Sequence, residues 1–65
     1  MKKYNYAKID GFAVLVTEQS TDWYPYGAKV VDGNEVDHEG NRVRRGHVFA
    51  QSDTEAYEKV RKLLS

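Results

Sequence analysis

The stretch from residue 52 to residue 64 constrains the fold most strongly, because it is the only part of the chain with a clear helical period. Its apolar residues recur at the spacing that places them on one face of a helix. They are Ala56, Tyr57, Val60, Leu63 and Leu64. Ser52 stands three positions before Glu55, which is the pattern of a capping box at a helix start. We therefore expect a C-terminal helix whose apolar face is covered by the rest of the chain.

Residues 3–17 have the pattern of a β-hairpin, because two alternating segments flank Asp10-Gly11. Asp-Gly favours a two-residue type I′ turn, in which both central residues have positive φ. Such a turn places three pairs of residues opposite one another: Ile9 and Phe12, Ala7 and Val14, and Asn5 and Val16. We expect the apolar members of these pairs to share one face and to pack against the helix.

Further strands are predicted at residues 28–31 and 47–50, with a second hairpin between residues 35–38 and 42–45. The fold class that follows is α+β, in one domain spanning residues 1–65. Its antiparallel sheet has four to five short strands in the order ββ-β-ββ-α, with the C-terminal helix packed on one face. The expected core is Phe12, Val14, Val16, Phe49, Tyr57, Val60 and Leu63, with Ala56 on the sheet-facing side of the helix.

The composition argues against several classes of function. Ten basic and ten acidic side chains give zero net charge, whereas proteins dedicated to duplex DNA usually carry a basic excess. The chain has no Cys, and His38 and His47 do not belong to any spacing typical of a zinc site, so we expect no metal. The five glycines occur singly, without a phosphate-binding loop, and no nucleophile motif is present. We therefore expect a protein that is not an enzyme and needs no cofactor.

The N-terminal Lys2-Lys3 is not followed by an apolar segment, and no run of residues is long and apolar enough to span a bilayer. We therefore expect a cytoplasmic protein that makes no contact with a membrane.

Charged residues of both signs follow one another in the second predicted hairpin. A turn at Gly40-Asn41 would place Asp37 opposite Arg44 and Glu39 opposite Arg42. Opposite charges in cross-strand positions stabilise a hairpin modestly, so we expect it to neutralise itself. The alternative is that the basic residues contact nucleic acid, and the candidates for this role are Lys29, Arg42, Arg44 and Arg45.

Trp23, Tyr24 and Tyr26 form the densest aromatic patch, and Pro25 among them indicates a loop or an edge rather than a central strand. Such side chains are enriched at protein-binding hot spots, they can stack on single-stranded bases, and they can also close a small core. The function we expect is a non-catalytic protein-binding module, such as an inhibitor, adaptor or accessory protein of the kind that phages and mobile elements encode. The alternative is binding of single-stranded nucleic acid or RNA through the patch and the arginines.

Overall fold

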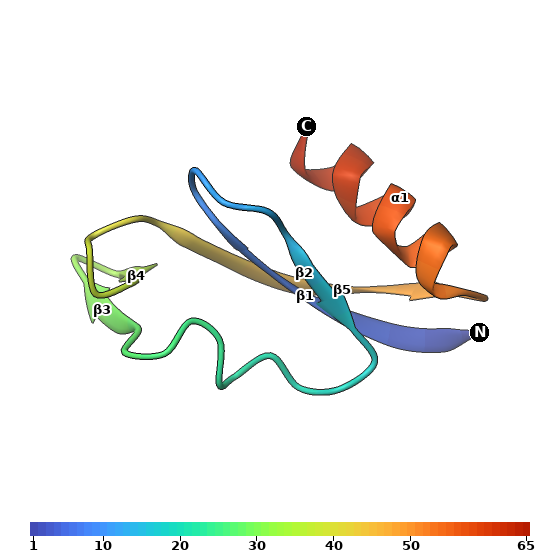
Figure 1. Ribbon diagram of the computed structural model, residues 1–65, viewed down its shortest axis with the longest axis horizontal. Helices are drawn as coiled ribbons and strands as arrows, with labels where there is room; N and C mark the ends of the chain where they lie inside the picture. Colours follow the sequence, from blue (N-terminus) through green and yellow to red (C-terminus); the bar gives the residue numbers. More distant parts are fainter.

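The computed structural model describes residues 1–65 and contains five strands and one helix. In chain order they are β1 (Lys2–Ile9), β2 (Leu15–Thr17), β3 (Lys29–Val31), β4 (Asn34–Val36), β5 (Val43–Ala50) and α1 (Asp53–Leu64). All strand pairs are antiparallel, which confirms the predicted α+β class. The strands form two sheets: β1 lies between β2 and β5 in the larger one, and β3 pairs with β4 in the smaller one (Figure 1).

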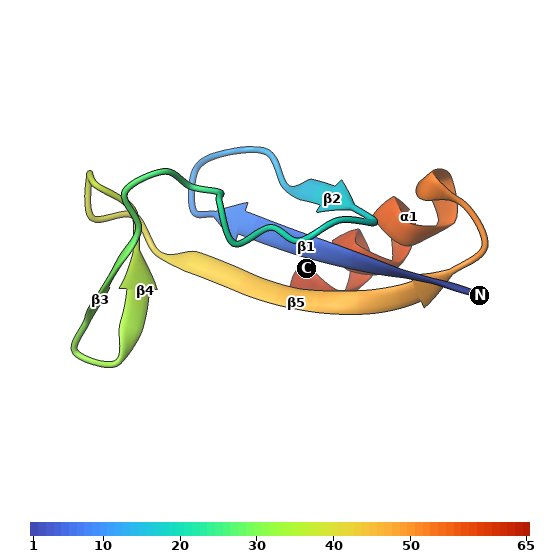
Figure 2. The ribbon, with the colours of Figure 1, turned by 90° about the horizontal axis from the view of Figure 1, so that it is seen from below.

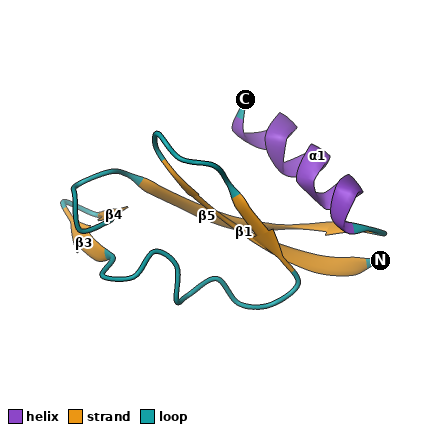
Figure 3. Ribbon diagram, viewed as in Figure 1, coloured by secondary structure: helices purple, strands orange, loops and turns teal.

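The larger sheet is covered on both faces. The helix α1 packs over one face against β5 and β2, and the connection through residues 18–28 crosses the other face (Figure 3). Side chains of the sheet hold this connection: Asn5 Nδ2 donates to Gln19 O at 2.9 Å, and Arg45 Nη1 donates to Thr21 O at 2.6 Å and to the Thr21 hydroxyl at 3.4 Å. The helix therefore has a loop, rather than a second helix, as its counterpart on the opposite face.

The predicted helix is confirmed, and local interactions fix its start. The Ser52 hydroxyl accepts a hydrogen bond from the Glu55 N–H at 3.2 Å, as a capping residue does. Acidic residues occupy its first turn and basic residues its last, in the order that the helix dipole favours. The helix is too short and too polar to cross a membrane.

Tyrosines of β1, rather than the hairpin valines, form the centre of the core. Tyr4 is only 1% exposed and packs with Ala50 and Ala56 beneath the helix, where Val16 and Val48 complete the cluster. Its hydroxyl finds no hydrogen-bond partner. Burial, and after it the interaction with the Asp53 carboxylate, raises the pKa of Tyr4 to about 12.

The predicted core was wrong for most of its members. The buried hydrophobic residues are Tyr4, Tyr6, Ala7, Ile9, Val43, Ala50, Ala56 and Val60. Four of these were expected: Ala7 and Ile9 from the first hairpin, and Ala56 and Val60 from the helix. Val14 and Val16 are half-buried. The remaining four, Phe12, Phe49, Tyr57 and Leu63, are exposed.

The error in the first hairpin is a shift of one residue. The observed pairs are Asn5 with Thr17, Tyr6 with Val16, and Ala7 with Leu15. Gly11 has a φ of 90° but Asp10 does not have a positive φ, so Asp10-Gly11 does not form the predicted type I′ turn. Since successive strand residues point to opposite faces, a shift of one residue reverses the face of every β2 side chain. Val16 therefore shares the face of Tyr6 and points toward α1.

The two-residue turn occurs instead at the second Asp-Gly, between β3 and β4. Asp32 and Gly33 both have positive φ, 53° and 81°, and Val31 pairs directly with Asn34. The second predicted hairpin reduces to a single bridge between Val36 and Arg42, after which β5 continues without a bulge through residues 43–50.

Gly46 is the residue of β5 that faces Tyr6, and a larger residue would not fit there. A Cβ at Gly46 would lie 2.5 Å from the Tyr6 Oη and 2.7 Å from its Cε2 and Cζ. The tyrosine ring thus lies directly on the glycine backbone of the neighbouring strand. This contact explains the glycine, which otherwise weakens a strand.

Gly46→Ala should destabilise the protein by about 1–3 kcal/mol, because the added methyl group forces the Tyr6 ring out of its position. In a Tyr6→Val background the same substitution should cost almost nothing, because the ring is gone. Urea unfolding of the two single variants and the double variant measures this coupling. Equal costs of Gly46→Ala in both backgrounds would contradict the contact.

Candidate functional site

The aromatic patch lies on the connection that crosses the face of the sheet opposite the helix. Trp23 is 63% exposed and Tyr26 is 93% exposed. Tyr24 is half-buried and meets Trp23 edge to face at 5.6 Å between ring centroids. Pro25 is buried, and the Tyr24–Pro25 peptide is cis. One residue of the patch therefore anchors it, while the two largest contact surfaces face outward.

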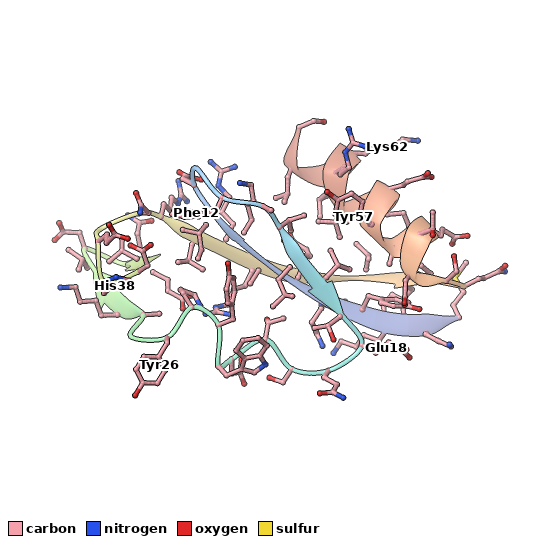
Figure 4. The ribbon with its side chains drawn as sticks, in the orientation of Figure 1. Phe12, Glu18, Tyr26, His38, Tyr57 and Lys62 are labelled. Carbon is pink, nitrogen blue, oxygen red and sulfur yellow. The ribbon has the colours of Figure 1, made fainter.

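These side chains form one wall of an open groove of about 470 Å³, which we call the aromatic groove. Three segments line it: the end of β1 with its turn, the aromatic loop and the turn after β4. The lining residues are Ile9, Phe12, Trp23, Tyr24, Pro25, Tyr26, Asp37, His38 and Glu39. Figure 4 shows Phe12, Tyr26 and His38 at the same end of the molecule. The volume is within the range of sites that bind small molecules or peptide side chains.

Sequence reasoning found one wall of this groove and missed the other two. Phe12 was expected in the core, but it is 51% exposed at the rim of the groove. Asp37 and Glu39 were expected to pair with arginines, and neither does so. No local signal in the sequence identifies these walls, because they come together only through the tertiary fold.

Arg45 holds the aromatic loop in place. Its Nε and Nη2 each donate to a carboxylate oxygen of Glu35 at 2.7 Å, and its Nη1 donates to the carbonyl of Thr21. The bidentate pair with Glu35 raises the pKa of Arg45 further above its ordinary value. This one side chain joins β5 to β4 and to the loop, so it is a structural residue rather than a free phosphate contact.

The other predicted basic contacts are also not in the groove. Arg44 is exposed and lies 3.9 Å from Asp10, while Lys29 and Arg42 are exposed and form no ion pair. The predicted pairs of Asp37 with Arg44 and of Glu39 with Arg42 were wrong. The reason is the width of the turn: the Asp37 N–H donates to Asn41 O, so that Val36 rather than Glu39 lies opposite Arg42.

Asp37 organises the turn that forms the acidic wall. It is 3% exposed, and its Oδ1 accepts hydrogen bonds from the Glu39 N–H at 2.9 Å and the Asn41 N–H at 2.8 Å. Its Oδ2 accepts a third from Asn41 Nδ2. Burial alone would raise the pKa of Asp37, but the hydrogen bonds from Asn41 and Glu39 outweigh it and hold the pKa below its ordinary value.

The groove carries negative charge only. Asp37 and Glu39 are its only Asp or Glu residues, and no Lys or Arg lines it. His38 Nε2 lies 3.7 Å from Glu39 Oε1, and both side chains are exposed. No cluster of three or more His, Asp or Glu side chains in the protein could hold a metal ion. The arrangement offers aromatic faces beside an exposed carboxylate, which is suited to an apolar ligand with a positive charge.

The pKa of Asp37 predicts an acid-sensitive turn. Because the pKa is lowered in the folded state, the stability that Asp37 contributes is present above its unfolded pKa and is lost as the pH falls through the folded value. Asp37→Asn should reduce stability at neutral pH and flatten its decline in acid, as measured by urea unfolding between neutral and acidic pH. Glu39→Gln removes an exposed carboxylate of the same turn and serves as the control. If Asp37→Asn and Glu39→Gln gave identical pH profiles, Asp37 would have no such role.

Comparisons with known proteins add no relative to this picture: no family model matches the chain, and no curated protein or solved structure does. The groove and the chemistry of the residues around it are therefore the basis for assigning a function.

Proposed function

We propose that this protein is a non-catalytic binding module that docks on another protein through the aromatic groove. The observation that carries the proposal is the exposure of Phe12, Trp23 and Tyr26 around one groove. Leaving large aromatic surfaces in water is unfavourable for an isolated domain, and such clusters mark interaction sites. Trp and Tyr also provide much of the binding energy at protein interfaces.

The charge of the groove indicates the chemistry of the partner. Glu39 is exposed at the rim, and Trp23 and Tyr26 offer aromatic faces that attract cations. No basic side chain lines the groove to compete for a carboxylate. The partner segment we propose is therefore a peptide stretch with a Lys or Arg side chain next to an apolar one.

Single-stranded nucleic acid or RNA remains the alternative ligand, because the same aromatic rings could stack on bases. The acidic rim opposes it, since carboxylates repel phosphates. Arg45 is occupied by Glu35, and Lys29, Arg42 and Arg44 lie outside the groove. These features support a protein ligand over a nucleic acid.

The absence of a catalytic role is part of the proposal. The oxygens of Asp37 accept hydrogen bonds from its own turn, and His38 and Glu39 are exposed to solvent. Catalytic acids and bases usually lie in a cleft beside a positioned partner that excludes water, whereas the side chains of His38 and Glu39 are exposed.

Trp23→Ser with Tyr26→Ser tests the groove. Peptides selected from a random display library on the wild-type protein should contain Lys or Arg beside apolar residues. The double variant should bind them at least ~2 kcal/mol more weakly, the usual threshold for a hot spot. Its thermal midpoint should stay close to that of the wild type, because both side chains are mostly exposed. Affinities can be measured by titration calorimetry.

The matched control is Val30→Ser, which removes an exposed apolar side chain of β3 outside the groove and should leave peptide binding unchanged. A double variant that lost several kcal/mol of stability would show that the aromatic residues close the core instead. Stronger binding to short oligonucleotides than to any selected peptide, with a steep dependence on salt, would favour the alternative ligand.

A further inference from the structure

The strand β5 pairs with β1 on one side only, so its second half forms a free edge of the sheet. Figure 2 shows β5 along one margin of the sheet, with the β3–β4 hairpin projecting beyond its first residues and no segment beside its second half. The opposite edge strand, β2, has only 3 residues, whereas β5 has 8. The longest unpaired edge of this protein is therefore the one formed by β5.

The alternation of hydrogen bonds along the β1–β5 ladder shows which backbone groups of β5 are free. The Asp10 N–H donates to Arg42 O at 2.9 Å, and this pair continues the register of β1 and β5. Bonded and non-bonded pairs alternate in an antiparallel ladder, so the even-numbered residues of β5 bond to β1 and the odd-numbered ones point outward. Beyond the contact with β4, the outward groups belong to Arg45, His47 and Phe49.

One of these outward groups is already capped within the chain. Lys59 Nζ donates to the carbonyl of Phe49 at 2.6 Å. Lysine at an edge is a common protection against unwanted strand pairing. A carbonyl oxygen has two lone pairs, however, so this contact leaves room for a second donor, and it leaves both backbone groups of His47 open.

Exposed apolar side chains lie on both sides of this edge. Phe49 is 50% exposed on the face of the sheet opposite the helix, where its ring meets His47 edge to face at 5.5 Å. On the other face, Leu63 is 60% exposed and lies one helical turn beyond Lys59. A strand added to β5 would cover apolar surface above and below it.

The two ends of β5 carry opposite charges, so two copies of the strand in antiparallel orientation are complementary. Arg44 lies near the start of the strand, whereas the strand leads into a helix whose first turn carries Asp53 and Glu55, of which Glu55 lies 3.3 Å from Lys59 Nζ and Asp53 forms no ion pair. Two copies that pair antiparallel bring Arg44 of each beside the acidic helix start of the other. A parallel arrangement would instead place the arginines together.

We propose that the occupant of this edge is a second copy of the chain, bound by antiparallel pairing of β5 with β5 about a two-fold axis near His47. The two three-stranded sheets then become one continuous sheet with both helices on the same face. The contact is closed, because each edge covers the other and neither remains free for a third copy. The dimer interface is separate from the aromatic groove.

His47→Pro tests the backbone contact directly. It removes an outward N–H while leaving the ladder to β1 intact, and proline is tolerated at such edge positions. His47→Ala removes the same imidazole but keeps the N–H, so it is the matched control. By symmetry the proline removes two intermolecular hydrogen bonds, and we expect it to raise the Kd of the dimer at least about tenfold relative to His47→Ala.

Sedimentation equilibrium of the full chain over a concentration series gives these values. A wild-type protein that stays monomeric at about millimolar concentration, where even weak specific association would be detected, overturns the proposal. Equal dissociation constants for the proline and alanine variants also overturn it. Trp23→Ser with Tyr26→Ser should leave the dimer unchanged, which separates this proposal from the binding function of the groove.

If His47→Pro does not fold, two substitutions that reverse charges at the proposed interface, Arg44→Asp and Asp53→Arg, provide a second test of the dimer. Arg44→Asp alone should weaken the dimer, and adding Asp53→Arg should restore it, because the reversed charges again lie side by side. If Asp53→Arg weakened the Arg44→Asp dimer further, the antiparallel arrangement would be wrong.

Discussion

The contact between the Tyr6 ring and the Gly46 backbone is the interaction on which the core and the position of the aromatic loop both depend. It sets β1 against β5 in a fixed register and leaves Tyr4 facing the helix, where Ala50 and Ala56 are small enough to receive its ring. Arg45, the residue before Gly46 in β5, then points to the opposite face and reaches Glu35 and Thr21. The position of the aromatic loop thus depends on the register of β1 and β5, which Tyr6 and Gly46 maintain on the other face of the sheet.

The parts of the fold that sequence reasoning predicted are those specified by local chemistry. The helix could be found because Ser52, Glu55 and the apolar period act within a few residues of one another. The register of the first hairpin could not be predicted, because the chain contains two Asp-Gly pairs and only the second adopts positive φ at both residues. That choice is made by packing: Tyr4 and Tyr6 bury more area than the valines do, and an amphipathic tyrosine gives no sign in the sequence of which face it will take.

The candidate site, like the fold, could be predicted from the sequence only where local chemistry specifies it. The outward position of Trp23 and Tyr26 follows from a short loop containing Pro25, and it could be anticipated. Phe12 and the turn held by Asp37 reach the groove only because of the shifted hairpin and the wide turn after β4. Arg44 and Arg42 were expected to pair with Asp37 and Glu39, with contacts to nucleic acid as the alternative, yet Arg44 and Arg45 emerge on opposite faces of β5 and Arg45 is bound by Glu35. The groove that results is lined by aromatic rings and two acidic residues, without a basic side chain.

The fluorescence of Trp23 tests the central claim most directly, namely that the tyrosines of β1 form the core while the aromatic loop is kept at the surface. Trp23 is the only tryptophan, so the signal has one source. Acrylamide is the suitable quencher, because it is uncharged and the acidic groove does not repel it. The account predicts emission close to that of solvated indole and strong quenching in the folded protein. Blue-shifted emission that acrylamide does not quench would place Trp23 inside the core and contradict the account.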